Sequence, residues 1–409
     1  MSPGGAASMG RREWSIVAAS VFCTVSAAVP PFLVGVLAIH IRDDFPFTSV
    51  HLAVVVAVYF GVSAAMSMAA GRIVRRFGAR RCVRTAMVLA VVSLALVASA
   101  WNWQTLLLAQ IAGGAGNSMV QPTVSQALGT VISRRFRGLA FGLNQSAVPL
   151  ATLVVALLIP FLALTLGWRW CAAVLAVEAA VVAFGVPDVR GRDAGRSGTI
   201  QTRRRRRRIG GSLPLLMCGA SFASMAGTNI PAFLTSSAAD MGMTARSAAA
   251  LQMAGSAVCV AVRVAAGWSG NGRRPDYLRP AAVMLVGGGV GYAFLASGSV
   301  GLFTAGALLA FGLGWGWSGL FHLSVTQRFG DDVAGATGVV QAGVYVGAMT
   351  GPLVFGVVFE RLGGGAAWTI TCGMSLVAAA LLLLAQLHLS RAAPATPHPP
   401  EKEGTTSWA

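Results

Sequence analysis

Long runs of apolar residues alternate with short polar connections along most of the chain. Each run holds about 16 to 29 residues, near the roughly 20 that an α-helix needs to cross the hydrocarbon core of a bilayer at 1.5 Å per residue. The runs are residues 14–40, 50–70, 85–100, 104–132, 139–166, 168–186, 213–239, 246–267, 278–295, 301–325, 336–359 and 366–387. The pattern predicts an all-α membrane protein with about twelve transmembrane helices.

An internal repeat relates the first six runs to the last six. A shift of 196 residues superimposes four pairs of positions, namely Thr48 on Thr244, Gly71 on Gly267, Gly142 on Gly338 and Gln145 on Gln341. Transporters are commonly built from such related halves. We therefore predict two pseudo-symmetric six-helix bundles. The expected segments are a cytoplasmic N-terminal tail (1–13), a first bundle (14–186), a basic cytoplasmic linker (187–212), a second bundle (213–387) and a cytoplasmic C-terminal tail (388–409).

Composition and charge agree with a membrane protein. The chain is 55% hydrophobic and 11% charged, whereas about a quarter of the residues in soluble domains are charged. A net charge of +18 would by itself suggest nucleic-acid binding, because clustered arginines neutralise phosphates. However, 25 of the 30 arginines lie in the tails, the linker and alternate connections, as the positive-inside rule describes for cytoplasmic segments. We expect a monomeric, multi-pass protein of the plasma (cytoplasmic) membrane, with cytoplasmic termini and no nucleic-acid partner.

The linker contains the most basic stretch of the chain, "QTRRRRRRIGG". Such a tract could be a nuclear-localisation signal or an RNA-binding segment. It could also be a solvated loop beside the membrane, where anionic headgroups attract arginines. We favour the second interpretation, because the tract lies between two helix ends predicted to be cytoplasmic.

Residue patterns that indicate catalysis or cofactor binding are missing from the sequence. The only lysine, Lys402, lies in the polar C-terminal tail, so no lysine can serve a phosphate-binding loop. The six cysteines are scattered without metal or redox spacing, and no triad or paired carboxylates are evident. We therefore expect no enzyme activity, no cofactor and no metal. The function that remains for a membrane protein of this kind is solute transport driven by a gradient, through a site near the membrane midplane.

The segment "GRIVRRFGARR" resembles the signature loop of the major facilitator superfamily. In that family a Gly, three residues and an Asp precede an Arg, a spacer, a Gly and a basic pair. The corresponding residues here are Gly71, Arg75 in place of the Asp, Arg76, Gly78, and the pair Arg80 and Arg81, which follows one residue late. The resemblance implies two six-helix bundles and solute transport by alternating access. Since the family's Asp contributes to a latch between the halves, Arg75 is expected to alter that latch.

Polar residues at helical spacing inside the apolar runs are the candidate solute ligands. Side chains 4, 7 or 11 residues apart share one face of a helix. The candidates are Gln110, Asn117 and Gln121 in the fourth run, Asn144 and Gln145 in the fifth, Gln252 and Arg263 in the eighth, His322 in the tenth, and Gln341 and Tyr345 in the eleventh. Either each amide faces a cavity, or it forms an interhelical hydrogen bond that only holds the helices together.

Arg263 is the most informative of these residues, because an arginine at the bilayer centre costs about 3 kcal/mol or more. A guanidinium binds a carboxylate through two parallel hydrogen bonds. The resemblance adds that an arginine on the eighth helix occurs in family members that carry small carboxylates, such as oxalate or monocarboxylate carriers. The alternative is that Arg263, one turn before Gly267, extends its side chain to the cytoplasmic headgroups.

Two further titratable residues lie in apolar runs. Glu178 is deep inside "WCAAVLAVEAAVVAFGVP" and is a candidate for proton coupling, unless it is a protonated side chain bonded to a neighbouring helix. His322 could titrate near neutral pH, or it could be a packed, hydrogen-bonded residue beside the tryptophans.

The leading hypothesis is a secondary active transporter of a small, carboxylate-like organic anion. The segments "GWGWSGLFHLSV" and "TGVVQAGVYVGAMTGP" resemble those of bacterial carriers grouped near the cyanate and carboxylate transporters. The alternative is a proton-coupled exporter of a drug or metabolite, although exporters usually carry a Gly-Pro pair on the fifth helix and here Gly351-Pro352 falls on the eleventh. A non-transporting receptor is a third hypothesis, which no appended soluble domain supports.

Overall fold

The computed structural model describes residues 9–133, 136–185, 212–269, 277–329 and 333–392. These residues form helices joined by short turns, without a β-strand among them. The first group comprises α1 (Arg11–Val36), α2 (Ala38–Asp44), α3 (Ser49–Phe77), α4 (Ala79–Ala98), α5 (Trp103–Val131), α6 (Arg137–Gln145), α7 (Ala147–Leu158), η1 (Ile159–Ala163) and α8 (Trp168–Gly185). The second comprises α10 (Leu213–Asp240), α11 (Ala245–Ser269), α12 (Leu278–Leu295), α13 (Val300–Leu309), η2 (Ala310–Gly314), α14 (Ser318–Arg328) and α15 (Val333–Ala392).

Twelve membrane-crossing helices account for this architecture. Ten helical segments of the described residues are long and apolar enough to span a bilayer. One of them, Ala336–Ser390, holds two helices, because Gly363 has a φ of 85° and interrupts the run. These segments account for eleven helices, and the 29-residue helix α5 is the twelfth. The predicted all-α fold with twelve helices is therefore confirmed.

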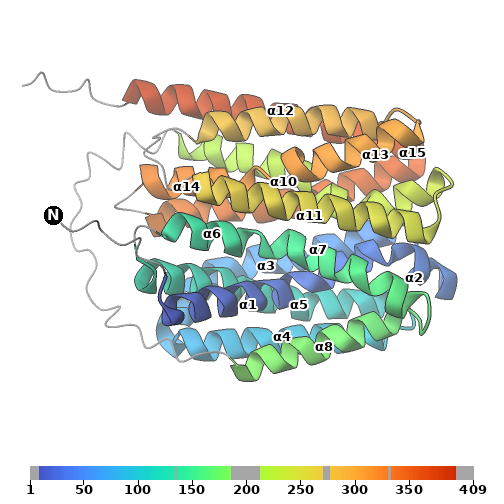
Figure 1. Ribbon diagram of the computed structural model, residues 1–409, viewed down its shortest axis with the longest axis horizontal. Coiled ribbons are helices and arrows are strands. Elements are labelled where there is room, and N and C mark those ends of the chain that lie inside the picture. The colour runs from blue at the N-terminus through green and yellow to red at the C-terminus, as the bar shows by residue number, and fades with distance from the viewer. Residues whose placement is uncertain (1–8, 134–135, 186–211, 270–276, 330–332, 393–409) are drawn as a thin grey trace, which may run out of the picture.

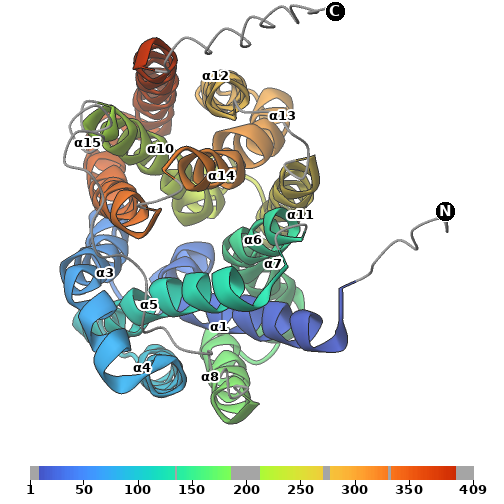
Figure 2. The ribbon, with the colours of Figure 1, turned by 90° about the vertical axis from the view of Figure 1, so that its left-hand side faces the viewer.

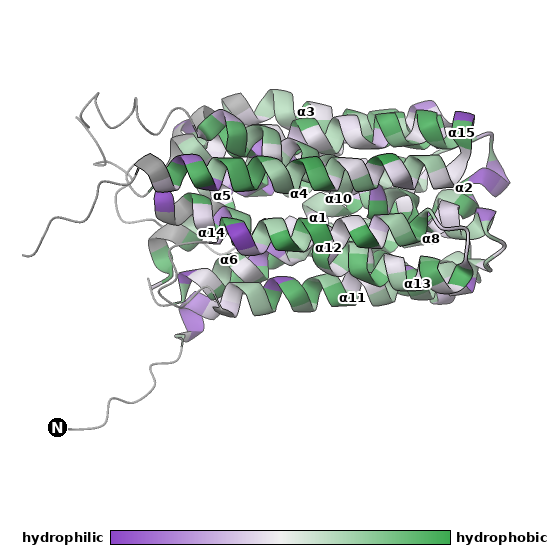
Figure 3. Ribbon diagram, turned by 90° about the horizontal axis from the view of Figure 1, so that it is seen from above, coloured by the Kyte–Doolittle hydropathy of each residue, from purple (hydrophilic) through white to green (hydrophobic). Residues whose placement is uncertain are grey.

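The helices lie roughly antiparallel to one another in two groups, α1 to α8 and α10 to α15 (Figures 1 and 2). Hydrophobic residues cover the length of the outer helices and hydrophilic ones gather at the ends (Figure 3). Large apolar side chains such as Phe161 and Phe184 are 70% and 86% exposed. Such an apolar surface is stable in contact with lipid rather than water, so the chain is a multi-pass integral membrane protein.

Two of the repeat positions begin equivalent helices in the two groups. The Thr48 hydroxyl accepts a hydrogen bond from the His51 N–H at the start of α3, at 3.2 Å. The Thr244 hydroxyl accepts one from the Ser247 N–H at the start of α11, also at 3.2 Å. A threonine N-cap satisfies a backbone donor that the first helical turn leaves unpaired. The 196-residue shift thus relates residues with the same local role.

Three predicted segments differ from the structure. The run 139–166 is interrupted after Gln145 and ends in the π-helix η1. The run 301–325 is interrupted by η2 and a turn at residues 315–317. The sequence predicts a loop at residues 71–81, but α3 continues to Phe77 and α4 begins at Ala79, with Gly78 alone at a φ of 81° between them. Arginine is a good helix former, so only the glycine ends the helix.

Contacts between the two groups close the end of the molecule opposite the chain termini. A Cβ on Gly35 of α1 would lie 2.9 Å from the Ala232 Cα of α10, so the two backbones touch there. The Thr235 hydroxyl donates to the Gly35 carbonyl at 3.2 Å. The Glu360 carboxylate accepts a hydrogen bond from the Val50 N–H at 2.9 Å. We call this the closed end.

An acidic residue also ties α2 to α8 at this end. The Trp168 indole N–H donates to Asp44 at 2.9 Å, and Arg169 bonds to the same carboxylate oxygen. These bonds stabilise the charged form, so the Trp168 indole and then Arg169 hold the pKa of the Asp44 carboxyl below its ordinary value. This contact lies within the first group and positions the α7–α8 connection.

Glu360→Gln is expected to weaken the closed end. The Glu360 carboxylate sits at the N-terminus of α3, where unpaired N–H groups and the helix dipole favour a negative charge by about 0.3–1 kcal/mol. Since the bond joins the two groups, its loss should make separation of the groups at this end roughly two- to fivefold more favourable. The measurement is the distance distribution between spin labels at the exposed residues Trp101 and Leu362.

Glu13→Gln is the matched control for this experiment. Glu13 also accepts two backbone N–H bonds, from Gly10 at 3.1 Å and Ser133 at 2.9 Å, but all three residues belong to the first group. Its replacement should leave the label distances unchanged. A Glu360→Gln variant that behaves like Glu13→Gln would show that the Glu360 bond does not hold the closed end together.

Candidate functional site

A cavity of about 110 Å³ lies between the two groups of helices. Side chains from α1, α3, α5, α6, α7, α10, α11, α14, α15 and the turn at 315–317 line it. Seven of the ten candidate ligands are among them: Asn117, Gln121, Gln145, Arg263, His322, Gln341 and Tyr345. The structure therefore brings residues from both groups to one space, although their binding of a solute stays a prediction.

The other three candidates do not line this cavity. Gln110 donates to the Pro30 carbonyl at 3.3 Å, and Asn144 accepts from the Thr24 hydroxyl at 3.0 Å. Both bonds connect helices within the first group, which is the packing role considered for an isolated amide. Gln252 is fully buried on α11, and its amide has no hydrogen-bond partner among the described residues.

Arg263 occupies the wall of the cavity and is only 3% exposed. Its Nη1 donates to the Gln145 carbonyl at 2.6 Å, and its Nη2 donates to the Trp315 carbonyl at 2.5 Å. The guanidinium carbon lies 5.1 Å from the centre of the Trp315 ring, within the range of a cation–π contact. The side chain thus points into the protein and not toward the membrane surface.

Interruptions of two helices provide the carbonyls that hold Arg263. In a regular helix the carbonyl of Gln145 would accept the N–H of residue 149, but that residue is proline and has no N–H. Trp315 follows η2, whose wide turn closes with the Trp315 N–H on the Ala310 carbonyl at 2.9 Å. Single π-turns of this kind are frequent at functional sites. Breaks in the fifth and tenth membrane helices therefore position a cation that joins the two groups.

The cavity lining contains a buried cation, Arg263, without an acidic side chain among the described lining residues. The two carbonyls offer only partial negative charges to the guanidinium, and the Cys259 side chain lies beside it. Among the described residues, the buried Arg263 Nε–H has no hydrogen-bond partner. Burying a cation is costly unless it is paired. An anion that enters the cavity would supply the missing charge.

Amide and phenol groups form another wall. The Tyr345 hydroxyl lies beside the side chains of Gln341 and Asn117, and the Asn117 amide donates to the Ser63 hydroxyl at 3.1 Å. Asn117 belongs to α5, whereas Gln341 and Tyr345 belong to α15. We call these three residues the amide wall, and it also spans both groups. These uncharged groups can donate or accept hydrogen bonds and therefore orient a polar solute.

Sequence reasoning missed the aromatic lining of the cavity. Phe32, Tyr59 and Phe60 line it, but an aromatic residue in an apolar run looks the same whether it faces lipid, core or solute. The one available signal is a proline. The Ala27 carbonyl loses its helical donor because residue 31 is proline, and the Tyr59 hydroxyl donates to that carbonyl at 2.5 Å.

Glu178 lies outside the cavity, between α8 and α1. The Ser26 hydroxyl is 3.0 Å from each of its carboxylate oxygens. The same hydroxyl is 2.9 Å from the Phe22 carbonyl. The carboxyl therefore contacts the helix that carries Phe32, and it does not touch the cavity itself.

None of the described residues that line the cavity belongs to the motif of residues 71–81. Arg76 is exposed and its guanidinium lies over the Phe77 ring, with 5.5 Å from its carbon to the ring centre. Arg80 and Arg81 are exposed in the first turn of α4. The surroundings of Gly71 and the side chain of Arg75 fall outside the described part of the chain, as do the tail residues 1–8 and 393–409 and nearly all of the linker.

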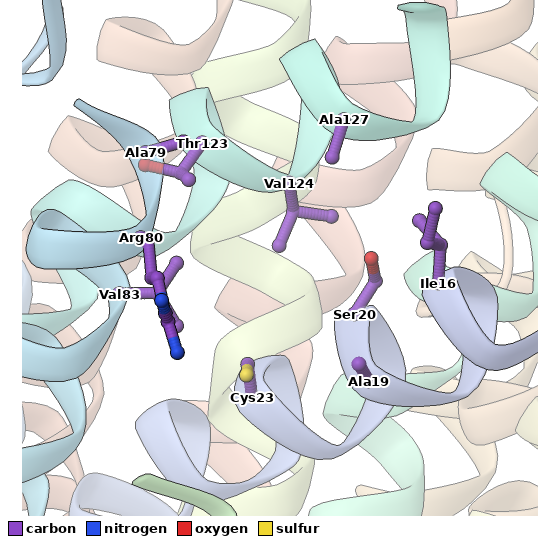
Figure 4. Close-up of a pocket in the computed structure, with 10 residues that line it drawn as sticks. All are labelled: Ile16, Ala19, Ser20, Cys23, Ala79, Arg80, Val83, Thr123, Val124 and Ala127. Carbon is purple, nitrogen blue, oxygen red and sulfur yellow. The ribbon is translucent and has the colours of Figure 1, made fainter. Parts of the chain in front are cut away.

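A second cavity, of about 40 Å³, lies within the first group. Figure 4 shows it between Ile16 and Cys23 of α1, Arg80 of α4, and Val124 and Ala127 of α5. Its lining is largely apolar, with Arg80 as its charged side chain among the residues described there. It is smaller than the first cavity, and its lining residues all belong to the first group of helices.

Comparisons with known proteins agree with this architecture. The family model described as Major Facilitator Superfamily matches residues 16–335. The solved structure of the human organic anion transporter MFSD10 (TETRAN) is 15% identical, covers 91% of this chain and 100% of its own, and has a TM-score of 0.66. A D-xylose-proton symporter is 14% identical, covers 90% of this chain and 97% of its own, and has a TM-score of 0.71. No curated protein sequence matches the chain.

Proposed function

Because the chain belongs to the major facilitator superfamily, we propose that it is a secondary transporter that carries a small organic anion by alternating access. The observation that carries the proposal is Arg263, a buried cation in the cavity between the two groups, without an acidic partner in the described lining. A carboxylate that enters the cavity could accept hydrogen bonds from the guanidinium, because Nη1 and Nη2 each have a second N–H beyond the one that bonds to a carbonyl. The neutral amide wall would orient the rest of the solute.

Alternating access fits the positions of the contacts between the groups. The closed end is sealed by Gly35, Ala232, Thr235 and Glu360, on the side of the cavity away from the termini. Rocking of the two groups about a midplane site would open this end and draw the helices together at the other, where α6 and α11 already touch at Gly142 and Gly267. Arg263 takes part in that movement, since its bond to the Gln145 carbonyl joins the groups at the cavity.

The side of the molecule with the termini is proposed to face the cytoplasm of a plasma membrane. Arg11 and Arg12 begin α1, and Arg80, Arg81 and Arg84 begin α4 at the same end. A concentration of arginines at one end agrees with the positive-inside rule. Under this orientation the closed end faces outward.

Matched carboxylates and amides provide the test of the proposed function. Purified full-length protein in liposomes should bind and transport carboxylates, while the corresponding uncharged amides should not move, because only the anion compensates Arg263. Transport restricted to neutral or cationic solutes would overturn the proposal in favour of the alternative, a proton-coupled exporter of a drug or metabolite.

Glu178 is the proposed proton-coupling residue. The Ser26 hydroxyl has one proton but lies within 3.0 Å of three oxygens, those of Phe22 and both of Glu178. If the hydroxyl donates to the Phe22 carbonyl, a protonated Glu178 must donate to Ser26. If Glu178 is ionised, the hydroxyl turns toward it. The contact therefore accommodates both protonation states of Glu178. Because Ser26 and Phe22 belong to α1, a change of protonation alters a hydrogen bond within that helix.

Glu178→Gln should uncouple protons from solute movement. The amide keeps a hydrogen bond to Ser26 but cannot release a proton, so exchange of solute should continue while net proton flux falls at least about tenfold. A pH-sensitive dye inside the liposomes measures the flux. Asp43→Asn, at an exposed acid, is the control and should leave the flux unchanged. A parental proton flux in Glu178→Gln would remove Glu178 from the coupling path.

A further inference from the structure

We infer that the solute is a planar aromatic monocarboxylate, whose ring packs against an aromatic wall beginning at Trp315. This inference rests on the proposed function, and it names the class of anion that the cavity fits. It combines three observations: a row of aromatic rings, a single strong cation at one end of that row, and an uncharged opposite wall.

The aromatic wall is continuous and crosses from one group of helices to the other. The Phe32 ring lies 5.6 Å from the Trp315 ring at 68°, and 6.2 Å from the Phe60 ring at 61°, measured between centres. Tyr59 continues the row at 5.0 Å from Phe60 and 86°. All four of these side chains line the cavity. Aromatic rings favour edge-to-face contacts of this kind, so the ring of a solute could pack against the wall in the same way.

The cation stands at the end of this wall. The Arg263 guanidinium lies over the Trp315 ring, so a carboxylate bound to it would be adjacent to the rings. A carboxylate attached directly to a planar ring places its charge at Arg263 and its apolar body against Phe32 and Trp315 at once. A short aliphatic acid would satisfy the cation and leave the aromatic wall uncovered.

The rest of the lining opposes a second negative charge on the solute. His322 is the other basic side chain described in the cavity, and it lies close to Arg263 itself. A carboxylate at the far side of the solute would therefore meet the amides of Asn117 and Gln341 or the faces of rings. Ring faces carry partial negative charge, and amides do not compensate for the lost hydration of an ion. The lining selects one carboxylate.

Binding of five probe compounds to the purified full-length protein tests this inference. Benzoate should bind roughly tenfold or more tightly than acetate, since ring packing adds to the charge contact. Cyclohexanecarboxylate, of similar size without a π-system, should bind less tightly than benzoate. Terephthalate, with two carboxylates, and benzamide, with none, should bind at least tenfold more weakly. Terephthalate binding equal to that of benzoate would overturn the inference.

A wall variant separates packing from charge. Phe60→Leu keeps an apolar side chain but removes a ring from the wall, so it should lower the ratio of benzoate to acetate affinity at least threefold. Phe161→Leu, at a residue 70% exposed on the membrane surface, is the matched control and should not change the ratio. Thermal unfolding of both variants checks folding, and the ratio is insensitive to the amount of active protein.

The outcomes distinguish this inference from the proposed function. If acetate and benzoate bind equally well and both depend on Arg263, the protein is an anion carrier without an aromatic preference, and this inference alone is wrong. An unchanged ratio of benzoate to acetate affinity in Phe60→Leu would likewise refute the aromatic preference and leave the proposed function standing. If none of the carboxylates binds, the proposed function fails together with it.

Discussion

Arg263→Gln should abolish transport of organic anions, and Arg263→Lys should impair it strongly. Loss of a charge-assisted contact in a desolvated site weakens binding by about 2–5 kcal/mol, which is roughly a thirtyfold to several-thousandfold loss of affinity. Lysine retains the charge but not the planar fork. The guanidinium donates to the Gln145 carbonyl through Nη1 and to the Trp315 carbonyl through Nη2, and the single nitrogen of lysine does not reproduce this pair of bonds.

The measurement is carboxylate binding and counterflow in liposomes, normalised to the amount of folded protein. Normalisation matters because each variant leaves buried carbonyls without their donor, at a cost of about 1–3 kcal/mol in stability. Arg246 provides the control, since it belongs to the same helix, α11, but is exposed. Arg246→Gln should transport like the parent. Parental binding and transport by Arg263→Lys would refute the carboxylate site.

Gly142→Leu should stop transport, whereas Gly338→Leu should be tolerated. A Cβ on Gly142 would lie 2.9 Å from the Gly267 Cα, so backbone meets backbone where α6 and α11 cross. A leucine there forces the two groups apart at the end with the termini, with a packing cost of about 1–3 kcal/mol. Gly338, its counterpart in the 196-residue repeat, is exposed, and a Cβ there would have no neighbour within 4 Å among the described residues.

The two variants are matched in chemistry and in place along the repeat. Leucine is a better helix former than glycine by roughly 0.8–1 kcal/mol, so local propensity should stabilise both helices. Any loss in Gly142→Leu must then arise from the contact with α11. Transport rate and thermal unfolding in liposomes are the measurements. Equal behaviour of the two variants would show that the close crossing at Gly142 is not required for the transport cycle.

The run of apolar residues was sufficient to predict the helices because membrane insertion depends on local hydrophobicity and length. It was not sufficient to predict where helices are interrupted. Pro149 and the glycines around Trp315 were visible in the sequence, yet a break at Gln145 and a π-turn at η2 depend on whether another group can bond to the freed carbonyls. In both cases that group is Arg263.

The spacing of polar residues indicated which side chains share a face of one helix. It placed Gln110, Asn117 and Gln121 on a common stripe, but in the structure only the last two line the cavity, while Gln110 bonds to α1. A stripe can run along a helix whose neighbours change from one end to the other. Which part of the stripe meets open space is decided by those neighbours.

The sequence by itself determined the membrane class, the number of helices and the relation of the two groups, since each of these follows from local composition or from repetition along the chain. Only the tertiary structure decided that Arg263 faces a cavity instead of the membrane surface, that Glu178 pairs with Ser26, and that Phe32 and Phe60 line the site. The physical reason is that periodicity defines a side chain's direction relative to its own helix axis. What lies in that direction depends on the rotation and position of the helix among its neighbours, which long-range packing sets.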